Sequence, residues 1–172
     1  MADEVLFSEK QRFRQWWIWA VLLGISLVFL IGFAIYFVEG EAAKNGTAGS
    51  IGMLFITVIP LALTWLFSRA TLETYISSKG IDIRFFPFVN KIRHIDWADI
   101  AEAYVREYKP LREFGGWGIR TGLTGRTGAW NVSGNEGLQL VMKNGTKLLV
   151  GTQKPEEIRQ MLTHIPGQKQ QA

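Results

Sequence analysis

The chain has 172 residues, of which 48% are apolar, and its mean hydropathy is +0.09. This length leaves room for one small folded domain beside any membrane segment, and the composition is too polar for a protein lying wholly in lipid. The absence of cysteine excludes a disulfide framework, a thiolate nucleophile and cysteine-ligated zinc or iron–sulfur sites. The net charge of +4 is uneven, because residues 69–172 hold 15 lysines and arginines against 10 aspartates and glutamates.

The first predicted element is a transmembrane helix over residues 15–38, which follows a cytoplasmic N-terminal segment, residues 1–14. No charged residue occurs between Trp16 and Val38, and this run exceeds the roughly 20 residues that cross a bilayer. It is also longer than the apolar core of a cleaved signal peptide, about 7 to 15 residues. We therefore expect a helix that remains in the protein.

A second transmembrane helix is predicted over residues 48–68. The run is uncharged and contains Pro60, a residue that membrane helices tolerate when neighbouring helices support the backbone. The extracytoplasmic loop between the spans, residues 39–47, is short and polar and contains the turn signal Asn45-Gly46. The two helices are therefore expected to form an antiparallel hairpin.

The charges and indoles around the spans predict their orientation. Basic residues precede the first span and follow the second, whereas the connector holds Lys44 alone, so the positive-inside rule places both termini in the cytoplasm. Indole side chains are typical membrane-interface anchors, and here they begin the first helix and end the second: Trp16, Trp17, Trp19 and Trp65. Neither span contains an Asp, Glu, Lys, Arg or His residue, which argues against a transporter or channel.

After residue 68 the apolar period becomes that of β-strands, and we expect a cytoplasmic domain over residues 69–165 with a flexible tail over 166–172. Seven strands are predicted, at residues 72–77, 81–88, 103–108, 116–121, 129–133, 138–142 and 147–151. Asn144-Gly145 is typical of a type I′ hairpin between the last two strands. Residues 155–165 begin with proline and acids and repeat apolar residues at helical spacing, which predicts an amphipathic helix.

Seven antiparallel strands followed by one helix is the order of a pleckstrin homology (PH) fold. The stretches Gly80–Arg84, Ile95–Ile100 and Gly151–Ile158 resemble membrane-anchored bacterial proteins that carry a PH-like domain, and Gly115–Arg120 resembles a subset of them. The resemblance implies an α+β chain: a transmembrane helical hairpin, then a seven-stranded antiparallel PH-like barrel or sandwich capped by a C-terminal α-helix. It also implies a multi-pass protein of the bacterial inner membrane. It implies little about chemistry, because function belongs to sites rather than to folds.

Four basic residues surround a glycine-rich stretch of the soluble domain: Lys109, Arg112, Arg120 and Arg126. Backbone N–H groups exposed at glycines and the planar guanidinium of arginine both suit phosphate, so these residues are candidates for a ligand or lipid site. The alternative is that the glycines serve tight strand turns and the arginines lie on solvated strand faces.

The sequence offers no catalytic or metal site. His94, Asp96 and Asp99 stand close together, but their spacing fits no metal motif, and we interpret them as a turn and a helix cap. No nucleophile elbow, phosphate loop or dinucleotide fingerprint is present. We therefore expect no enzyme activity, no metal and no cofactor.

The expected function is that of a non-enzymatic, membrane-anchored module that mediates protein assembly or interaction at the cytoplasmic face. Its expected partners are the lipid bilayer and either a second copy of the chain or another membrane protein, and no nucleic acid. The alternative is an anionic-lipid-sensing domain, because a basic residue placed near anionic headgroups contributes about 1 kcal/mol of attraction.

Overall fold

The computed structural model describes residues 5–122 and 125–165, except for the side chains of residues 41–43. Contacts divide the chain into two compact units: one spans Arg14–Arg69, and the other joins the residues before Arg14 to those after Arg69. In sequence, a helical unit is thus inserted into a strand-rich unit. The predicted tail, residues 166–172, lies outside the described residues.

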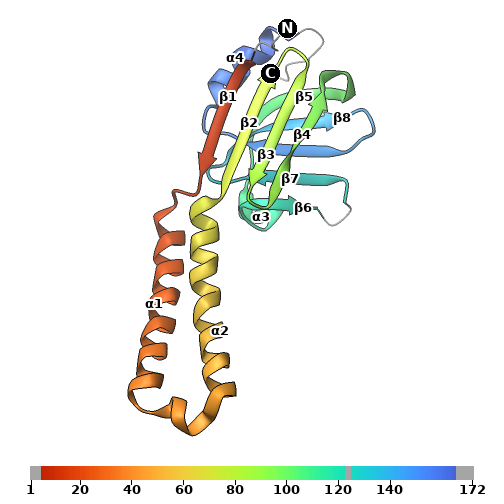
Figure 1. Ribbon diagram of the computed structural model, residues 1–172. Helices are drawn as coiled ribbons and strands as arrows, with labels where there is room; N and C mark the ends of the chain where they lie inside the picture. The colour runs from red at the N-terminus through yellow and green to blue at the C-terminus, as the bar shows by residue number, and fades with distance from the viewer. Residues whose placement is uncertain (1–4, 123–124, 166–172) are drawn as a thin grey trace. The chain divides into compact units, whose positions relative to one another are not determined.

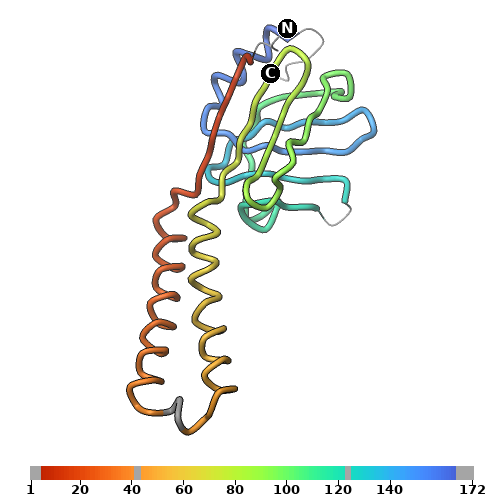
Figure 2. The backbone as a smooth tube through the Cα atoms, in the orientation of Figure 1, coloured from red at the N-terminus to blue at the C-terminus, as the bar shows by residue number. Residues whose placement is uncertain are grey.

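The helical unit consists of α1 (Trp16–Val38) and α2 (Glu41–Arg69), which run side by side as a hairpin (Figures 1 and 2). Both helices are long and apolar enough to cross a membrane, which confirms the prediction of two such helices. α2 begins within the residues predicted as the connector, and its backbone departs from helical geometry at Gly46, where φ is 65°. The hydroxyls of Ser26 and Thr64 lie 3.0 Å apart and join the two helices.

The strand-rich unit begins with a four-stranded antiparallel sheet in the order β1-β2-β3-β4. Its strands are β1 (Val5–Arg12), β2 (Thr71–Ser77), β3 (Gly80–Phe86) and β4 (Val89–Asp96). The structure confirms the strands predicted around residues 72–77 and 81–88. It adds β1, which lies within the predicted N-terminal segment, and β4.

A second sheet holds five strands in the order β5-β8-β9-β7-β6. After the 3-10 turn η1 (Trp97–Asp99), its elements are β5 (Ile100–Glu107), α3 (Pro110–Phe114), β6 (Gly118–Thr121), β7 (Thr127–Asn131), β8 (Glu136–Met142) and β9 (Lys147–Gly151). The predicted hairpin at Asn144-Gly145 connects β8 to β9. Its turn is not the expected type I′, because Gly145 has positive φ but Asn144 does not.

The expectation of a seven-stranded antiparallel barrel or sandwich is wrong in the number of strands and in the direction of one strand pair, and the sheets do not close into a barrel. The described residues form nine strands in two open sheets, and β7 runs parallel to β9. The parallel pair arises because the β6–β7 hairpin docks on the side of β9 that β8 leaves free. What is confirmed is coarser: an α+β chain with two long apolar helices, two sheets and the C-terminal helix α4 (Pro155–Thr163).

Buried apolar side chains come from both sheets and from α4, among them Leu72, Ile83, Leu140, Leu149 and Ile158. Polar contacts tie β1 to the end of β9 and to the chain that follows. Glu9 is buried and accepts hydrogen bonds from Thr152 Oγ1 at 2.6 Å and from the Gln153 backbone N–H at 2.8 Å. Gln11 Nε2 donates to the Gly151 carbonyl at 2.6 Å. The start of the strand-rich unit is thus fastened to its end.

Candidate functional site

β5 is an edge strand, and this exposes part of its backbone. It pairs with β8 on one side and stands at the end of the sheet order, so among the described residues no strand covers its other side. In an antiparallel pair, alternate residues of an edge strand direct their N–H and C=O groups away from the partner. These groups form a row along which another extended segment could pair.

α4 lies beside this edge and is held there by its apolar face. Pro155 occupies the first turn together with Glu156 and Glu157, as is favourable for a helix N-terminus. Ile158 and Leu162 are buried, so one face of the helix packs into the unit. The opposite face stays in contact with solvent.

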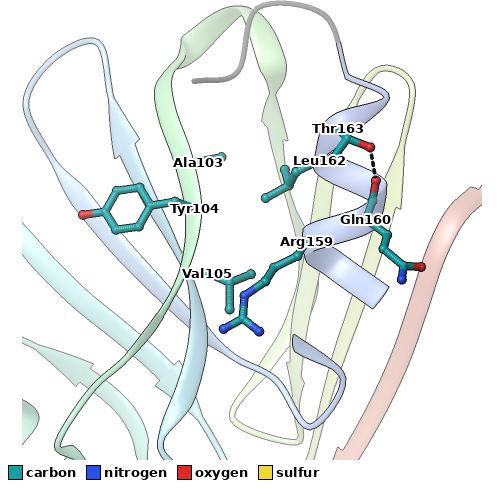
Figure 3. A pocket seen from close by; sticks show the side chains of 7 residues that line it. All are labelled: Ala103, Tyr104, Val105, Arg159, Gln160, Leu162 and Thr163. Carbon is teal, nitrogen blue, oxygen red and sulfur yellow. Dashed lines mark hydrogen bonds between the residues drawn. The ribbon is translucent and has the colours of Figure 1, made fainter. Parts of the chain in front are cut away.

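A groove of about 310 Å³ separates β5 from α4 (Figure 3). Its lining residues come from the middle of the strand and from the last two turns of the helix: Ala103, Tyr104, Val105, Arg159, Gln160, Leu162 and Thr163. In Figure 3 the ring of Tyr104 points away from α4, whereas Leu162 and Arg159 extend from α4 toward the strand. The groove thus combines an apolar wall with the edge of a sheet.

Arg159 provides the positive charge of the groove. Its guanidinium contacts Glu136 Oε1 at 3.1 Å and also pairs with Glu156. Both acids and the arginine are partly exposed, so these pairs hold the guanidinium in position at a small free-energy gain, on the order of 0–1 kcal/mol each. An incoming carboxylate could exchange with either acid.

The structure places the four predicted basic residues along the β5–β7 connections. Lys109 precedes α3, and Arg112 lies within that helix. Arg120 lies on β6, and its Nε donates to the Trp117 carbonyl at 3.2 Å. Arg126 comes just before β7, where its carbonyl accepts a hydrogen bond from the Lys147 N–H.

An acid in this region opposes an anion site. Glu113 accepts a hydrogen bond from Arg106 Nη2 at 2.8 Å and another from the Lys109 backbone N–H at 2.8 Å. The hydrogen bond from Arg106 lowers the pKa of Glu113 below its usual value, so this carboxylate is charged at neutral pH. It already occupies donors that a phosphate would need.

The four predicted indole anchors all lie on the helical unit, at the ends of α1 and α2 nearest the strands in sequence. Trp16, Trp17 and Trp65 are exposed by 79%, 45% and 60%, and Trp19 is half-buried. The guanidinium of Arg69 lies 5.9 Å from the ring centroid of Trp65, a cation–π distance. Exposed indoles beside basic residues are typical of a helix end at a membrane surface.

The interpretation of His94, Asp96 and Asp99 as a turn and a helix cap is right for the turn, η1, and wrong for the cap. Asp96 occupies the N-cap position directly before η1, but its side chain makes no capping hydrogen bond. Instead, His94 Nδ1 lies 2.6 Å from Asp82 Oδ1 on the neighbouring strand, and His94 Nε2 lies 3.7 Å from Asp96. The hydrogen bond to Asp82 raises the pKa of His94 above its ordinary value. Within residues 5–122 and 125–165, no three His, Asp or Glu side chains are grouped so as to hold a metal ion.

The β5–α4 groove was not foreseen from the sequence, although its two walls were. The strand over 103–108 and the helix over 155–165 were both predicted, but the position of β5 at a sheet edge depends on strand order. The apolar period of the helix was the available signal, since it required a packing partner.

Comparison with protein-family models, with curated proteins and with solved structures finds no match to this chain.

Proposed function

We propose that this chain is a non-enzymatic module, anchored in a bacterial inner membrane by α1 and α2, whose strand-rich domain binds an extended protein segment at the cytoplasmic face. The single observation that carries the proposal is the free edge of β5 beside α4. Adding a strand to an exposed sheet edge is a recurring mode of peptide recognition, in which main-chain hydrogen bonds supply affinity and flanking pockets supply specificity.

The order of elements supports a PH-like domain. A four-stranded meander, β1 to β4, is followed by the three-stranded meander β5-β8-β9 and then by α4. This is the order that the resemblance implies, with the β6–β7 hairpin as an insertion and with the helical hairpin inserted between β1 and β2. The groove between the fifth strand and the closing helix would then be the binding surface.

The chemistry of the groove suggests what kind of segment it takes. Backbone groups of β5 would pair with an extended chain, and Leu162 and Val105 offer an apolar surface for a side chain that points inward. Arg159 would attract an acidic residue of the same segment, one or two positions from that inward-pointing side chain. We therefore propose an extended segment that places an apolar residue next to an acidic one, belonging to another membrane protein or to a second copy of this chain.

Cytoplasmic placement of the domain rests on charge. Arg12, Arg14 and Arg69 flank the two helices on the side of the strand-rich unit in sequence, and Lys44 is the basic residue of the connecting region. Positive residues are retained on the cytoplasmic side.

Site-directed crosslinking in native membranes tests the proposal. The chain has no cysteine, so a photoreactive probe can be attached to a single Gln160→Cys variant, at an exposed position in the groove. We expect one crosslinked species, lost when the neighbouring Thr163→Trp fills the groove and retained with Lys143→Trp on the exposed β8–β9 turn. Recovery of monomer alone, or crosslinking insensitive to Thr163→Trp, would exclude the groove as the binding surface.

An anionic-lipid-sensing role is the second candidate, favoured by the basic excess of residues 69–172 and by the exposed side chain of Arg112. The pairing of Glu113 with Arg106 reduces the donors available to a phosphate. Binding of the purified protein to vesicles that does not respond to anionic lipid or to salt would count against this role.

A further inference from the structure

The turn between β3 and β4 is apolar and exposed, unlike the tips of the β2–β3 and β8–β9 hairpins. Phe86 is exposed by 39% and Phe88 by 50%, and Pro87 stands between them. The tips of the β2–β3 and β8–β9 hairpins carry Ser78-Lys79 and Asn144-Gly145 instead. We call residues 86–88 the aromatic turn. Large exposed apolar side chains grouped in this way mark an interaction surface.

Strand register places the aromatic turn at the end of the sheet where the chain enters and leaves the helical hairpin. Thr71, the first residue of β2, pairs with Phe86, and it also pairs with Arg12, the last residue of β1. The polar β2–β3 tip is at the opposite end of the same strands. Of the two ends of this sheet, the apolar tip is therefore at the end connected to α1 and α2.

The covalent chain limits how far the aromatic turn can lie from the end of α2. Ala70 alone separates Arg69 from Thr71. Two steps of about 3.8 Å, and about 5 Å between paired residues, keep the Cα of Phe86 within about 13 Å of the Cα of Arg69. This limit follows from connectivity and register, and it holds for any arrangement of the two units.

The aromatic turn is held in place from beneath. The Phe88 ring packs on Phe85, with centroids 5.8 Å apart, and Phe85 meets Phe13 edge-on at 6.5 Å. Phe13 and Phe85 are buried, so they belong to the core. The exposed ring of Phe88 is thus supported by a packed aromatic base, and Phe86 is the last residue of the paired strand β3.

We propose that the aromatic turn inserts into the interfacial region of the bilayer leaflet at which α1 begins and α2 ends. The occupant of this surface is lipid, because basic residues flank an uncharged apolar tip on both sides: Arg12 at the paired end of β1, and Lys91, the third residue of β4. An apolar tip with a basic rim is the pattern of interfacial membrane binding. The proposal rests on the proposed membrane anchoring and adds a second contact with lipid, made by the domain itself.

Fluorescence of single-cysteine variants of the full chain tests the insertion of the aromatic turn. Each variant is reconstituted into phosphatidylcholine vesicles that contain a minority of phosphatidylglycerol, and an environment-sensitive probe is then attached to the cysteine. Phe86→Cys is the test position, and Phe88→Cys repeats it should the first variant fold poorly. Tyr75→Cys is the matched control, because Tyr75 is exposed by 40% on the same face of the same sheet but lies four residues, roughly 13 Å, along β2 from Thr71.

We expect a blue-shifted emission at position 86, quenching by lipids that carry a spin label near the headgroup, and loss of quenching by aqueous iodide. The probe at position 75 should show the reverse. Iodide quenching at position 86 equal to that at position 75 overturns the proposal. Protection from both quenchers also overturns it, since a second protein would then cover the turn.

A probe at Leu27→Cys, an exposed position at the middle of α1, separates the two proposals when the vesicles also contain lipids that carry the spin label near the end of the acyl chain. Lipid quenching at Leu27 without lipid quenching at Phe86 rejects insertion of the aromatic turn while membrane anchoring stands. Absence of lipid quenching at both positions rejects both proposals.

Discussion

The carboxylate of Glu9 joins β1 to residues more than a hundred positions later, so replacing Glu9 tests how the start of the strand-rich unit is held to its end. Replacing it with alanine leaves the buried Thr152 hydroxyl without its acceptor at 2.6 Å, and the Gln153 N–H without its acceptor at 2.8 Å. Hydrogen bonds to a charged group contribute about 1.5–3 kcal/mol each. Gln153 is exposed, so water can replace the second bond. We expect Glu9→Ala to lower the free energy of unfolding by about 2–3 kcal/mol.

The assay is denaturant unfolding of the full chain in detergent, followed by tryptophan fluorescence. Ser8→Ala, at the exposed neighbour on the same strand, is the matched control and should change the free energy by less than about 0.5 kcal/mol. A double-mutant cycle of Glu9→Ala with Thr152→Val should give a coupling energy above about 0.5 kcal/mol. A Glu9→Ala variant as stable as the Ser8→Ala control would refute the closing role of this carboxylate.

Three further changes have expected outcomes. His94 has a raised pKa, so its pairing with Asp82 stabilises the fold fully below pH 6.5. This stabilisation is lost as the pH rises through the pKa of His94 in the folded state. The pair is half-exposed and contributes less than about 1 kcal/mol. Asp82→Asn should flatten this dependence in thermal melts, and an unchanged pH profile would contradict it. Tyr108→Phe removes the hydroxyl that accepts a hydrogen bond from the buried Asn131 Nδ2 at 3.0 Å. The substitution should lower the free energy of unfolding by about 1–2 kcal/mol and speed amide hydrogen exchange in β6. Exchange at the wild-type rate would contradict this expectation. Ile158→Ala, at a side chain exposed by 1%, should cost about 2–4 kcal/mol in denaturant unfolding, and a cost below about 1 kcal/mol would show that α4 is loosely packed.

The elements predicted well are those whose own residues carry a complete pattern. α1 coincides with its charge-free run, Trp16–Val38, because an apolar helix of this length needs no partner to be recognised. The β8–β9 hairpin was predicted because Asn144-Gly145 is a strong turn signal between two apolar runs, and Gly145 has φ of 80°. The finer prediction of a type I′ turn was wrong, because Asn144 does not adopt the positive φ that such a turn requires.

β1 and β4 were missed because their partners, not their own residues, decide their conformation. The inward positions of β1 include Phe7, Glu9 and Gln11, so polar side chains interrupt the alternation that would announce a strand. These polar groups are stable in the interior only because residues from the other end of the chain bond to them. β4 buries Ile95 alone among its eight residues, so it has hardly any apolar period.

Strand order limited the prediction of the candidate site as well. Arg112, Arg120 and Arg126 were grouped because they are near in sequence, yet Arg120 lies on β6 and Arg126 beside Lys147. The walls of the β5–α4 groove are about fifty residues apart in sequence and carry no motif that links them. Only the sheet order shows that β5 has a free edge.

The insertion of α1 and α2 between two paired strands has a consequence for the order of synthesis. β1 leaves the ribosome before both helices, whereas its partner β2 leaves after them. β1 must therefore remain without its partner β2 while both helices are made, and its contacts with residues 152 and 153 can form only after those residues have been synthesised. Late, non-local pairing of this kind is slow and leaves an edge open to wrong partners. The four-stranded sheet can thus be completed only after the helical hairpin has been made. A fragment that starts at residue 69 would lack β1, the strand that completes this sheet.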